Sequence, residues 1–252
     1  MGRLLMYSAF GEFRSGIDRL LAGHPKSDRI DVETHERFLD LCRASFGRVS
    51  LEEFVGDYVD DLNKNDHNSG SSLFHENGFV KLSMWKFPCG AQLRYHIWPA
   101  GSYIDSRIHS HRWNLSSYIL RGELTAFNYS EDDENGSLFS MTKLFDADGD
   151  GIKPSEFIGK KRLARTASYS IRTNDGHYVD QKILHQVKKS SGDIAISLML
   201  SGRALSPYSV VSDFVPGYKS VARRFLSPSE ISRLVTDSVA RTESEQPILV
   251  AR

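Results

Sequence analysis

Residues 116–129 read SSYILRGELTAFNY, a run of aromatic and aliphatic side chains interrupted by one glycine. Similar runs occur at FVKLSMWKF (79–87), QLRYHIW (92–98), LFSMTKLF (138–145), ASYSIRT (167–173), YVDQKILHQV (178–187) and DIAISLML (193–200). Short runs of this composition, separated by turn-forming residues at roughly ten-residue spacing, are typical of strands in a sandwich or small barrel. No helical pattern intervenes. The sequence therefore predicts a mostly β fold for this region.

Amphipathic helices are predicted before the β region. DVETHERFLDLCRASFG (31–47) and SLEEFVGDYVDDLNKN (50–65) each place apolar residues on one side at helical spacing. Ser50 and Glu53 have the spacing of a capping box, in which each side chain bonds the backbone of the other residue. These signals predict two consecutive helices.

A further helix is predicted after the β region, in LSPSEISRLVTDSVAR (226–241), with Ser227 as N-cap and Glu230 completing a second capping box. The polar stretch NDHNSGSS (65–72) is the best internal boundary. We therefore expect an N-terminal helical segment (1–72), a β-barrel (73–208) and a C-terminal segment with one helix (209–252).

The composition argues against several broad classes of function. The chain has 252 residues with 32 basic and 32 acidic side chains, so its lack of net charge gives no support to a nucleic-acid-binding role. No apolar run is long enough for a membrane span, and the N-terminus lacks the apolar core of a signal peptide. Cys42 and Cys89 form no CxxC pair. A reduced, cytoplasmic protein is expected.

Two histidines, His109 and His111, occur in IHSHRWN (108–114) with one serine between them. On a strand, residues two apart point to the same side, so the two imidazoles would form half of a metal site. His185 is the preferred third ligand because it comes late in the β region, and His96 is the substitute. His177 follows the turn residues TNDG and is expected to be solvated.

These motifs resemble the cupin superfamily over roughly residues 75–205. The first cupin motif corresponds to Gly101, His109, His111 and Gly122, and the second to His185, followed by GDIAISLMLSG. The resemblance implies a double-stranded β-helix, or jelly-roll barrel. It also implies that the three histidines hold a metal inside the mouth of this barrel.

The chain departs from the common cupin pattern where many members carry a ligating glutamate, because Leu115 or Ser116 takes that place. The resemblance then implies a three-histidine, mononuclear non-haem iron site, distantly similar to that of the thiol dioxygenases. Three neutral imidazoles leave the charge of Fe(II) uncompensated, which favours a small polar or anionic substrate that chelates the metal, with dioxygen beside it. Another divalent transition metal would also bind imidazoles.

Strand alternation suggests which side chains surround this metal. If His109 and His111 face inward, Arg107 and Trp113 should do so too, and Arg112 should face outward. Arg107 would then bind a substrate carboxylate or phosphate, with Trp113 and Arg94 as further substrate-binding residues. Arg94, His96 and Trp98 share one face of another strand, and Tyr118 shares a face with Leu120. His96 and Tyr118 are candidate proton donors.

The first functional hypothesis is a cupin-type Fe(II) oxygenase or dioxygenase acting on a small metabolite. A non-redox isomerase or epimerase, with the metal as Lewis acid, and a non-catalytic ligand-binding protein are the alternatives. The helical segments are expected to cap the barrel or to build a homodimer interface. FDADGDGIKPSEF (145–157) resembles a calcium loop, but its glutamate comes one position early. We interpret it as a hairpin tip between two strands.

Overall fold

The computed structural model describes residues 8–23, 30–65, 72–75, 77–102, 104–145, 154–189, 192–213 and 225–240. Within them the helices are α1 (Ala9–Ala22), α2 (Val32–Phe46), α3 (Leu51–Asn65) and α4 (Pro228–Ala240). The strands are β1 (Leu73–Phe74), β2 (Val80–Lys86), β3 (Gln92–Trp98), β4 (Ile104–Asp105), β5 (Leu115–Arg121), β6 (Glu123–Glu131), β7 (Ser137–Phe145), β8 (Ser155–Arg172), β9 (Gly176–Val179), β10 (Leu184–Lys189), β11 (Ala195–Ser201) and β12 (Tyr208–Ser212).

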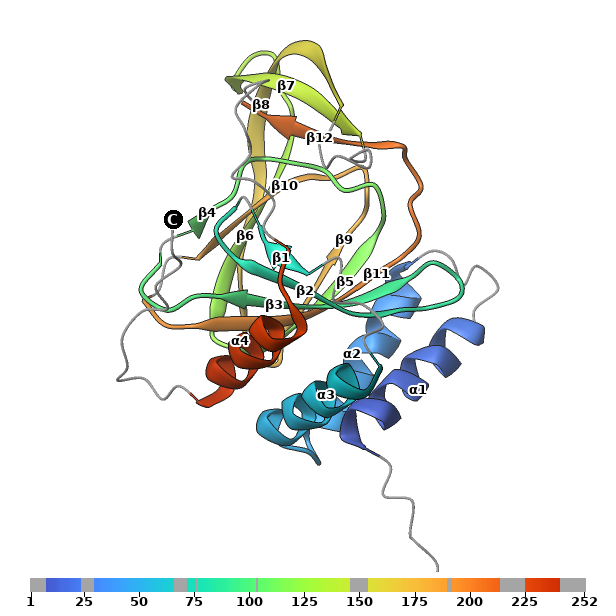
Figure 1. The fold of residues 1–252 in the computed structure, drawn as a ribbon. Coiled ribbons are helices and arrows are strands. Elements are labelled where there is room, and N and C mark those ends of the chain that lie inside the picture. The colour runs from blue at the N-terminus through green and yellow to red at the C-terminus, as the bar shows by residue number, and fades with distance from the viewer. Residues whose placement is uncertain are drawn as a thin grey trace, which may run out of the picture.

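The strands form two antiparallel sheets of six strands each. The first has the order β1-β2-β3-β11-β5-β9 and the second the order β12-β7-β8-β6-β10-β4. The two sheets curl around a common interior, and the helices lie along the outside of the first sheet (Figure 1). The mostly β barrel, with helices before and after it in the sequence, is therefore confirmed. β12 carries the second sheet to Ser212, beyond the expected barrel end at residue 208.

The first sheet is buried on both faces because the helices cover its outer side. Leu93, Tyr95 and Ile97 of β3 belong to one apolar core together with buried side chains of all four helices. The alternate residues of β3 point into the barrel instead. This two-sided burial fixes the strand register, since a slip by one residue would exchange the two sets of side chains.

The predicted capping box before α4 is complete, and at the start of α3 the N-cap bond of Ser50 is present. The backbone N–H of Glu53 donates to Ser50 Oγ at 3.0 Å, at the start of α3. The backbone N–H of Ser227 donates to Glu230 Oε2 at 2.9 Å, and that of Glu230 to Ser227 Oγ at 3.3 Å, before α4. No helix in the described parts of the chain has the length and apolar character needed to cross a bilayer.

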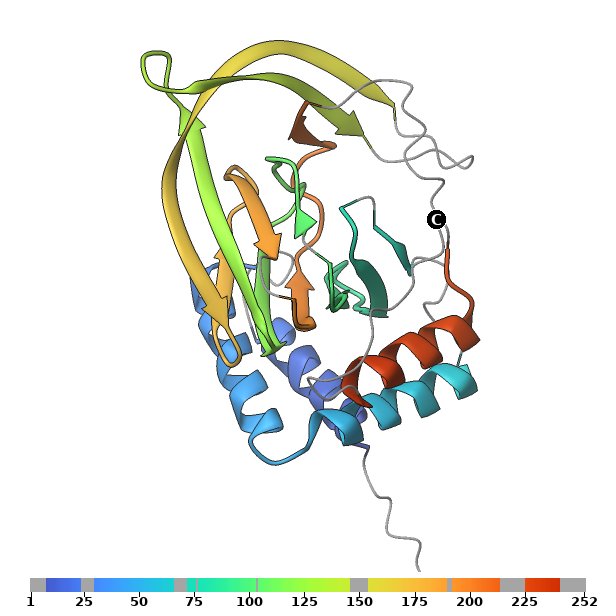
Figure 2. The ribbon, with the colours of Figure 1, turned by 90° about the vertical axis from the view of Figure 1, so that its left-hand side faces the viewer.

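The second sheet has a long antiparallel pair, β7 and β8, that arches over the barrel (Figure 2). β8 runs without interruption over 18 residues, so the short strand expected at 167–173 is only its last part. Leu144 pairs with Ser155, which places strands on both sides of the calcium-loop lookalike. Residues 146–153 of that loop, and residues 66–71 of the predicted linker, lie outside the described residues.

Gly122 marks the turn between β5 and β6, where the chain passes from the first sheet to the second. Its φ of 80° lies in the left-handed region, and a Cβ there would clash with the carbonyl oxygen of Ile194. Only glycine fits such a position without strain. Backbone conformation and close packing therefore explain why the last residue of the first motif, Gly122, is a glycine.

Candidate metal centre

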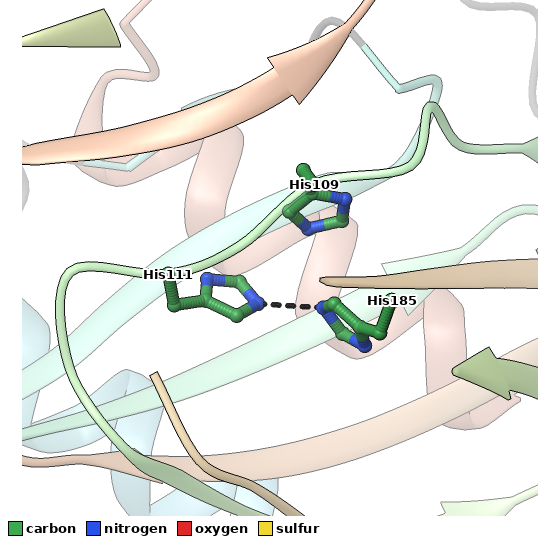
Figure 3. A group of neighbouring side chains, drawn as sticks. All are labelled: His109, His111 and His185. Carbon is green, nitrogen blue, oxygen red and sulfur yellow. Dashed lines mark hydrogen bonds between the residues drawn. The ribbon is translucent and has the colours of Figure 1, made fainter. Parts of the chain in front are cut away.

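The three predicted ligands meet where the irregular segment after β4 passes the start of β10. His109 and His185 form an isolated antiparallel bridge, in which each backbone N–H donates to the other residue's carbonyl oxygen at 2.8 Å. His109 also bridges Val211 of β12. The expected strand around His109 and His111 is thus reduced to single bridges, although both imidazoles still point to one place (Figure 3).

One nitrogen from each of His109, His111 and His185 lies within 4.8 Å of the others. The ring centroids are 4.6 to 4.9 Å apart. Nε2 of His111 and Nε2 of His185 are separated by 2.9 Å (Figure 3). Two nitrogens that bind a metal at about 2.1 Å in adjacent octahedral positions lie roughly 3 Å apart, so this pair fits a divalent transition metal.

The backbone fixes the ring of His109. Its Nδ1 donates to the carbonyl oxygen of Arg107 at 2.8 Å. With the proton on Nδ1, the lone pair of Nε2 is available to a metal, which is the usual arrangement in histidine metal sites. His185 differs, because its buried Nδ1 has no hydrogen-bond partner.

Burial keeps the other two imidazoles neutral. Desolvation is the main cause that lowers the pKa of His111 and of His185 well below 6.5, and the neighbouring His109 lowers both further. Arg94 also lowers the pKa of His111. A neutral imidazole is the form that binds metals, so no proton has to be removed from these two rings at neutral pH.

A cavity of about 370 Å³ opens beside the histidines, inside the barrel. Its walls include Arg94, His96 and Trp98 of β3. The face of β3 that carries these three residues therefore points into the barrel. Arg107 and Trp113 line it as well, as expected. The functional roles proposed for these residues remain predictions.

Arg112 is a correction to the alternation argument. It was expected to face outward, yet it lines the cavity, and its guanidinium lies 5.1 Å from the centroid of the Trp113 ring. The reason is that residues 110–114 are not in a strand, so strict alternation does not apply to them.

Tyr118 is a second correction, because the structure places it away from the cavity. Leu115, Ser117 and Ile119 of β5 line the cavity, whereas Tyr118 belongs to the core shared with the helices. Its hydroxyl donates to Asn174 Oδ1 at 2.9 Å. The side chain of Tyr118 therefore lies outside the cavity that holds the three histidines.

His177 was expected to be solvated, but it is buried against the candidate metal site. It lies on β9, its ring is stacked 6.0 Å from that of His185, and it lines the cavity. Its Nδ1 is 3.0 Å from the hydroxyl of Tyr169, and its Nε2 has no partner. The alternation with Val179, two residues later and also buried, was the signal that His177 faces inward.

A second cavity, of about 440 Å³, lies between the β7–β8 pair and the barrel. Ser110 and His111 line both cavities. Met141, Ile158 and Leu163 form its apolar side, and Lys161 and Lys182 line it as well. Of the three candidate ligands, only His111 lines both cavities.

No family model matches the sequence, and no curated protein does. Among solved structures, the Cnp3 cupin domain of Schizosaccharomyces pombe has a TM-score of 0.30 and 9% identity, over 50% of this chain and 61% of that one. An RmlC-like cupin family protein of Methanocaldococcus jannaschii has a TM-score of 0.31 and 11% identity, over 51% of this chain and 84% of that one.

Hydroquinone 1,2-dioxygenase from Sphingomonas sp. TTNP3 is also similar, with a TM-score of 0.32 and 10% identity, over 49% of this chain and 65% of that one. The match thus spans less than two thirds of the S. pombe and Sphingomonas chains. At these TM-scores the likeness is remote and does not bear on the activity of this chain.

Proposed function

We propose that the protein is a mononuclear non-haem iron oxygenase, in the simplest case a dioxygenase. His109, His111 and His185 would hold Fe(II). The observation that carries this proposal is the convergence of their three nitrogens within 4.8 Å at the wall of a cavity. Fe(II), when bound, would supply Lewis acidity and one-electron chemistry with dioxygen.

The donor set favours a substrate with negative charge. Neutral imidazoles bring no charge of their own to a bound metal, and burial holds His111 and His185 in that form. A small metabolite that chelates the metal through an anionic group would compensate the metal's charge. We therefore assign a small polar or anionic metabolite as the substrate.

Two further histidines of the cavity, His96 and His177, could make hydrogen bonds to a ligand there. Burial, together with Arg94 and Lys81, lowers the pKa of His96 to about 3, so its ring is neutral at pH 7. The buried Nε2 of His177 has no hydrogen-bond partner. If Tyr169 donates to Nδ1 of His177, then Nε2 carries the hydrogen and can donate a hydrogen bond to a ligand in the cavity.

Arg107 contributes in two ways. Its backbone carbonyl holds the His109 ring, and its side chain lines the cavity. We expect the guanidinium to contact an anionic substrate. On the opposite wall, the buried side chains of Arg94, His96 and Trp98 would limit the access of water, which strengthens charge interactions there.

Elemental analysis and oxygen uptake test the proposal. The parent protein should contain iron and consume dioxygen with at least one member of a panel of small thiols, amino acids and diketones. His109→Ala should lose both. His35→Ala is the matched control, because His35 bonds Ser116 Oγ at 2.7 Å on the helix side of the first sheet.

Unchanged iron content in His109→Ala would remove this residue from the ligand set. Metal-dependent turnover of a substrate without oxygen would instead favour the isomerase or epimerase alternative. A protein that binds ligands equally well after metal removal, with no turnover in either atmosphere, would favour the binding-protein alternative.

A further inference from the structure

The cavity beside the three histidines has a strongly one-sided charge. Lys81, Arg94, Arg107 and Arg112 line it together with six histidines, and no aspartate or glutamate is among its described lining residues. The chain as a whole has equal numbers of acidic and basic side chains. The excess of positive charge is therefore a local property of this cavity and favours an anion within it.

Arg94 is the most unusual member of this lining. It is only 6% exposed, and its hydrogen bond goes from Nη2 to the neutral Oε1 of Gln92 at 2.7 Å. Its guanidinium also lies 4.6 Å from the centroid of the Trp113 ring. Burial and the nearby Arg112 lower its pKa to about 10, and no carboxylate opposes this effect. A buried charge without a counter-charge is expensive, so a bound anion would stabilise it.

Hydrogen-bond donors without acceptors surround the same space. The indole nitrogens Nε1 of Trp98 and Trp113 are buried and have no partner, and an indole N–H can only donate. Four of the five N–H groups of the Arg94 guanidinium are left over by its one bond to Gln92. These indole and guanidinium N–H groups have no acceptor of their own, and a ligand rich in acceptor oxygens would supply one.

The wall next to Arg94 is apolar. Met199 lies opposite Arg94 in the pairing of β11 with β3, and it clusters with Leu115 and Val179, against which Trp113 packs. Trp113 is also 6.3 Å from the ring of His111, measured between centroids. A ligand held at Arg94 would therefore lie against an apolar wall, close to the candidate metal site. An apolar ligand body would suit this wall.

We propose that Arg94, over the ring of Trp113, forms a carboxylate-binding subsite, and that the ligand of this cavity is a carboxylate with an apolar body. The planar fork of a guanidinium matches a carboxylate in bidentate fashion. This inference rests on the proposed function only for the other end of the ligand, which would chelate the metal. The subsite itself consists of side chains that need no metal.

Calorimetric titration of the metal-stripped protein tests the subsite with four probes: benzoate, the uncharged benzamide, acetate, which lacks the apolar body, and phenyl phosphate. Benzoate should bind at least about tenfold more tightly than the other three, because charge-assisted bonds and apolar burial must act together. Binding of benzamide as tight as that of benzoate would overturn the charge requirement. Tighter binding of phenyl phosphate would overturn the assignment to a carboxylate.

Substitutions of Arg94 test whether benzoate binds at this residue. Arg94→Gln should weaken benzoate binding about 10- to 100-fold, as expected for the loss of a bidentate charged pair, and Arg94→Lys should weaken it less. Arg172→Gln is the matched control, since Arg172 is largely exposed and pairs with Glu123 outside the cavity. Unchanged benzoate affinity in Arg94→Gln would overturn the proposal. If circular dichroism shows that this variant does not fold, Arg94→Lys and the probe preference of the parent decide the matter.

The outcome is separable from that of the proposed function. His109→Ala should lose iron but keep the benzoate affinity of the metal-stripped parent. A parent protein that contains no metal would contradict the oxygenase and leave the benzoate result valid. A parent with iron and oxygen uptake, but with no preference for benzoate, would contradict only the subsite.

Discussion

The two faces of strand β3 differ in what their side chains do. Leu93, Tyr95 and Ile97 are fully buried against the helices and belong to the large apolar core. On the opposite face, Arg94, His96 and Trp98 are nearly as buried, yet they line a cavity and two of them have a nitrogen without a partner. One strand thus packs the apolar core with one set of residues and lines the cavity with the other.

This difference has a physical basis. A core face is stable when it excludes water and leaves no polar group unpaired. The cavity face violates both conditions, and such violations are expected where a ligand completes the site. Substitutions on the two faces should therefore separate: one set should change metal and ligand binding, the other the free energy of unfolding.

The largest effect is expected for His111→Ala. Removing one of three ligands should reduce metal affinity more than about 100-fold, because loss of an outer-shell partner alone typically costs 10- to 100-fold. The metal-free variant should remain folded, because His111 makes no contribution to the apolar core. Metal titration of the parent and the variant measures the change. Equal affinities would show that His111 is not a ligand. They would also remove the expected difference between the cavity side and the helix side of the first sheet.

The opposite result is expected for Ile97→Ala on the helix side. Ile97 is fully buried, and truncation of such a residue destabilises a protein by about 2–5 kcal/mol, through lost apolar contacts and the resulting cavity. Chemical denaturation of the metal-free protein measures this loss. The metal affinity of the folded variant should equal that of the parent. A drop in affinity as large as that of His111→Ala would mean that the two faces are not independent.

A smaller effect concerns acid stability and His96. Its pKa of about 3 in the folded protein lies below the value of about 6.5 expected in the unfolded chain. Between these values the unfolded state binds more protons, so stability is lost as the pH falls from about 6.5 toward 3.

His96→Leu removes this contribution. Between pH 6 and pH 4 its unfolding free energy should fall by about 1.4 kcal/mol less per pH unit than that of the parent. Urea denaturation at several pH values gives the two slopes. Parallel curves for parent and variant would show that His96 is not held neutral by burial.

The sequence was sufficient for the parts that depend on local patterns. Alternating apolar residues predicted the strands, and the spacing at Ser50 and Ser227 predicted the helix caps. The two motifs predicted that His109, His111 and His185 lie close together, as they do in the structure. Each of these features follows from neighbouring residues or from a resemblance that spans the barrel.

The errors occurred where tertiary contacts override local patterns. His177 follows a turn, but pairing of β9 with β5 turns its ring inward. Arg112 lies in a segment held by single bridges rather than by a regular ladder. Tyr118 could have faced either side of β5, and only the packing of the helices on the first sheet decides this. Such decisions depend on residues far away in the chain.

The smallest effect is expected for Tyr118→Phe, and it sharpens the contrast at a residue that sequence reasoning had assigned to catalysis. The variant loses the hydrogen bond to Asn174 Oδ1, which should reduce stability by about 0.5–1.5 kcal/mol. Its ring contact with Phe46 is unaffected, since the hydroxyl plays no part in it. Iron content and oxygen uptake should match the parent, because Tyr118 lies on the helix side of β5. A tenfold or greater loss of turnover, with iron retained, would mean that the helix side of the first sheet takes part in the reaction after all.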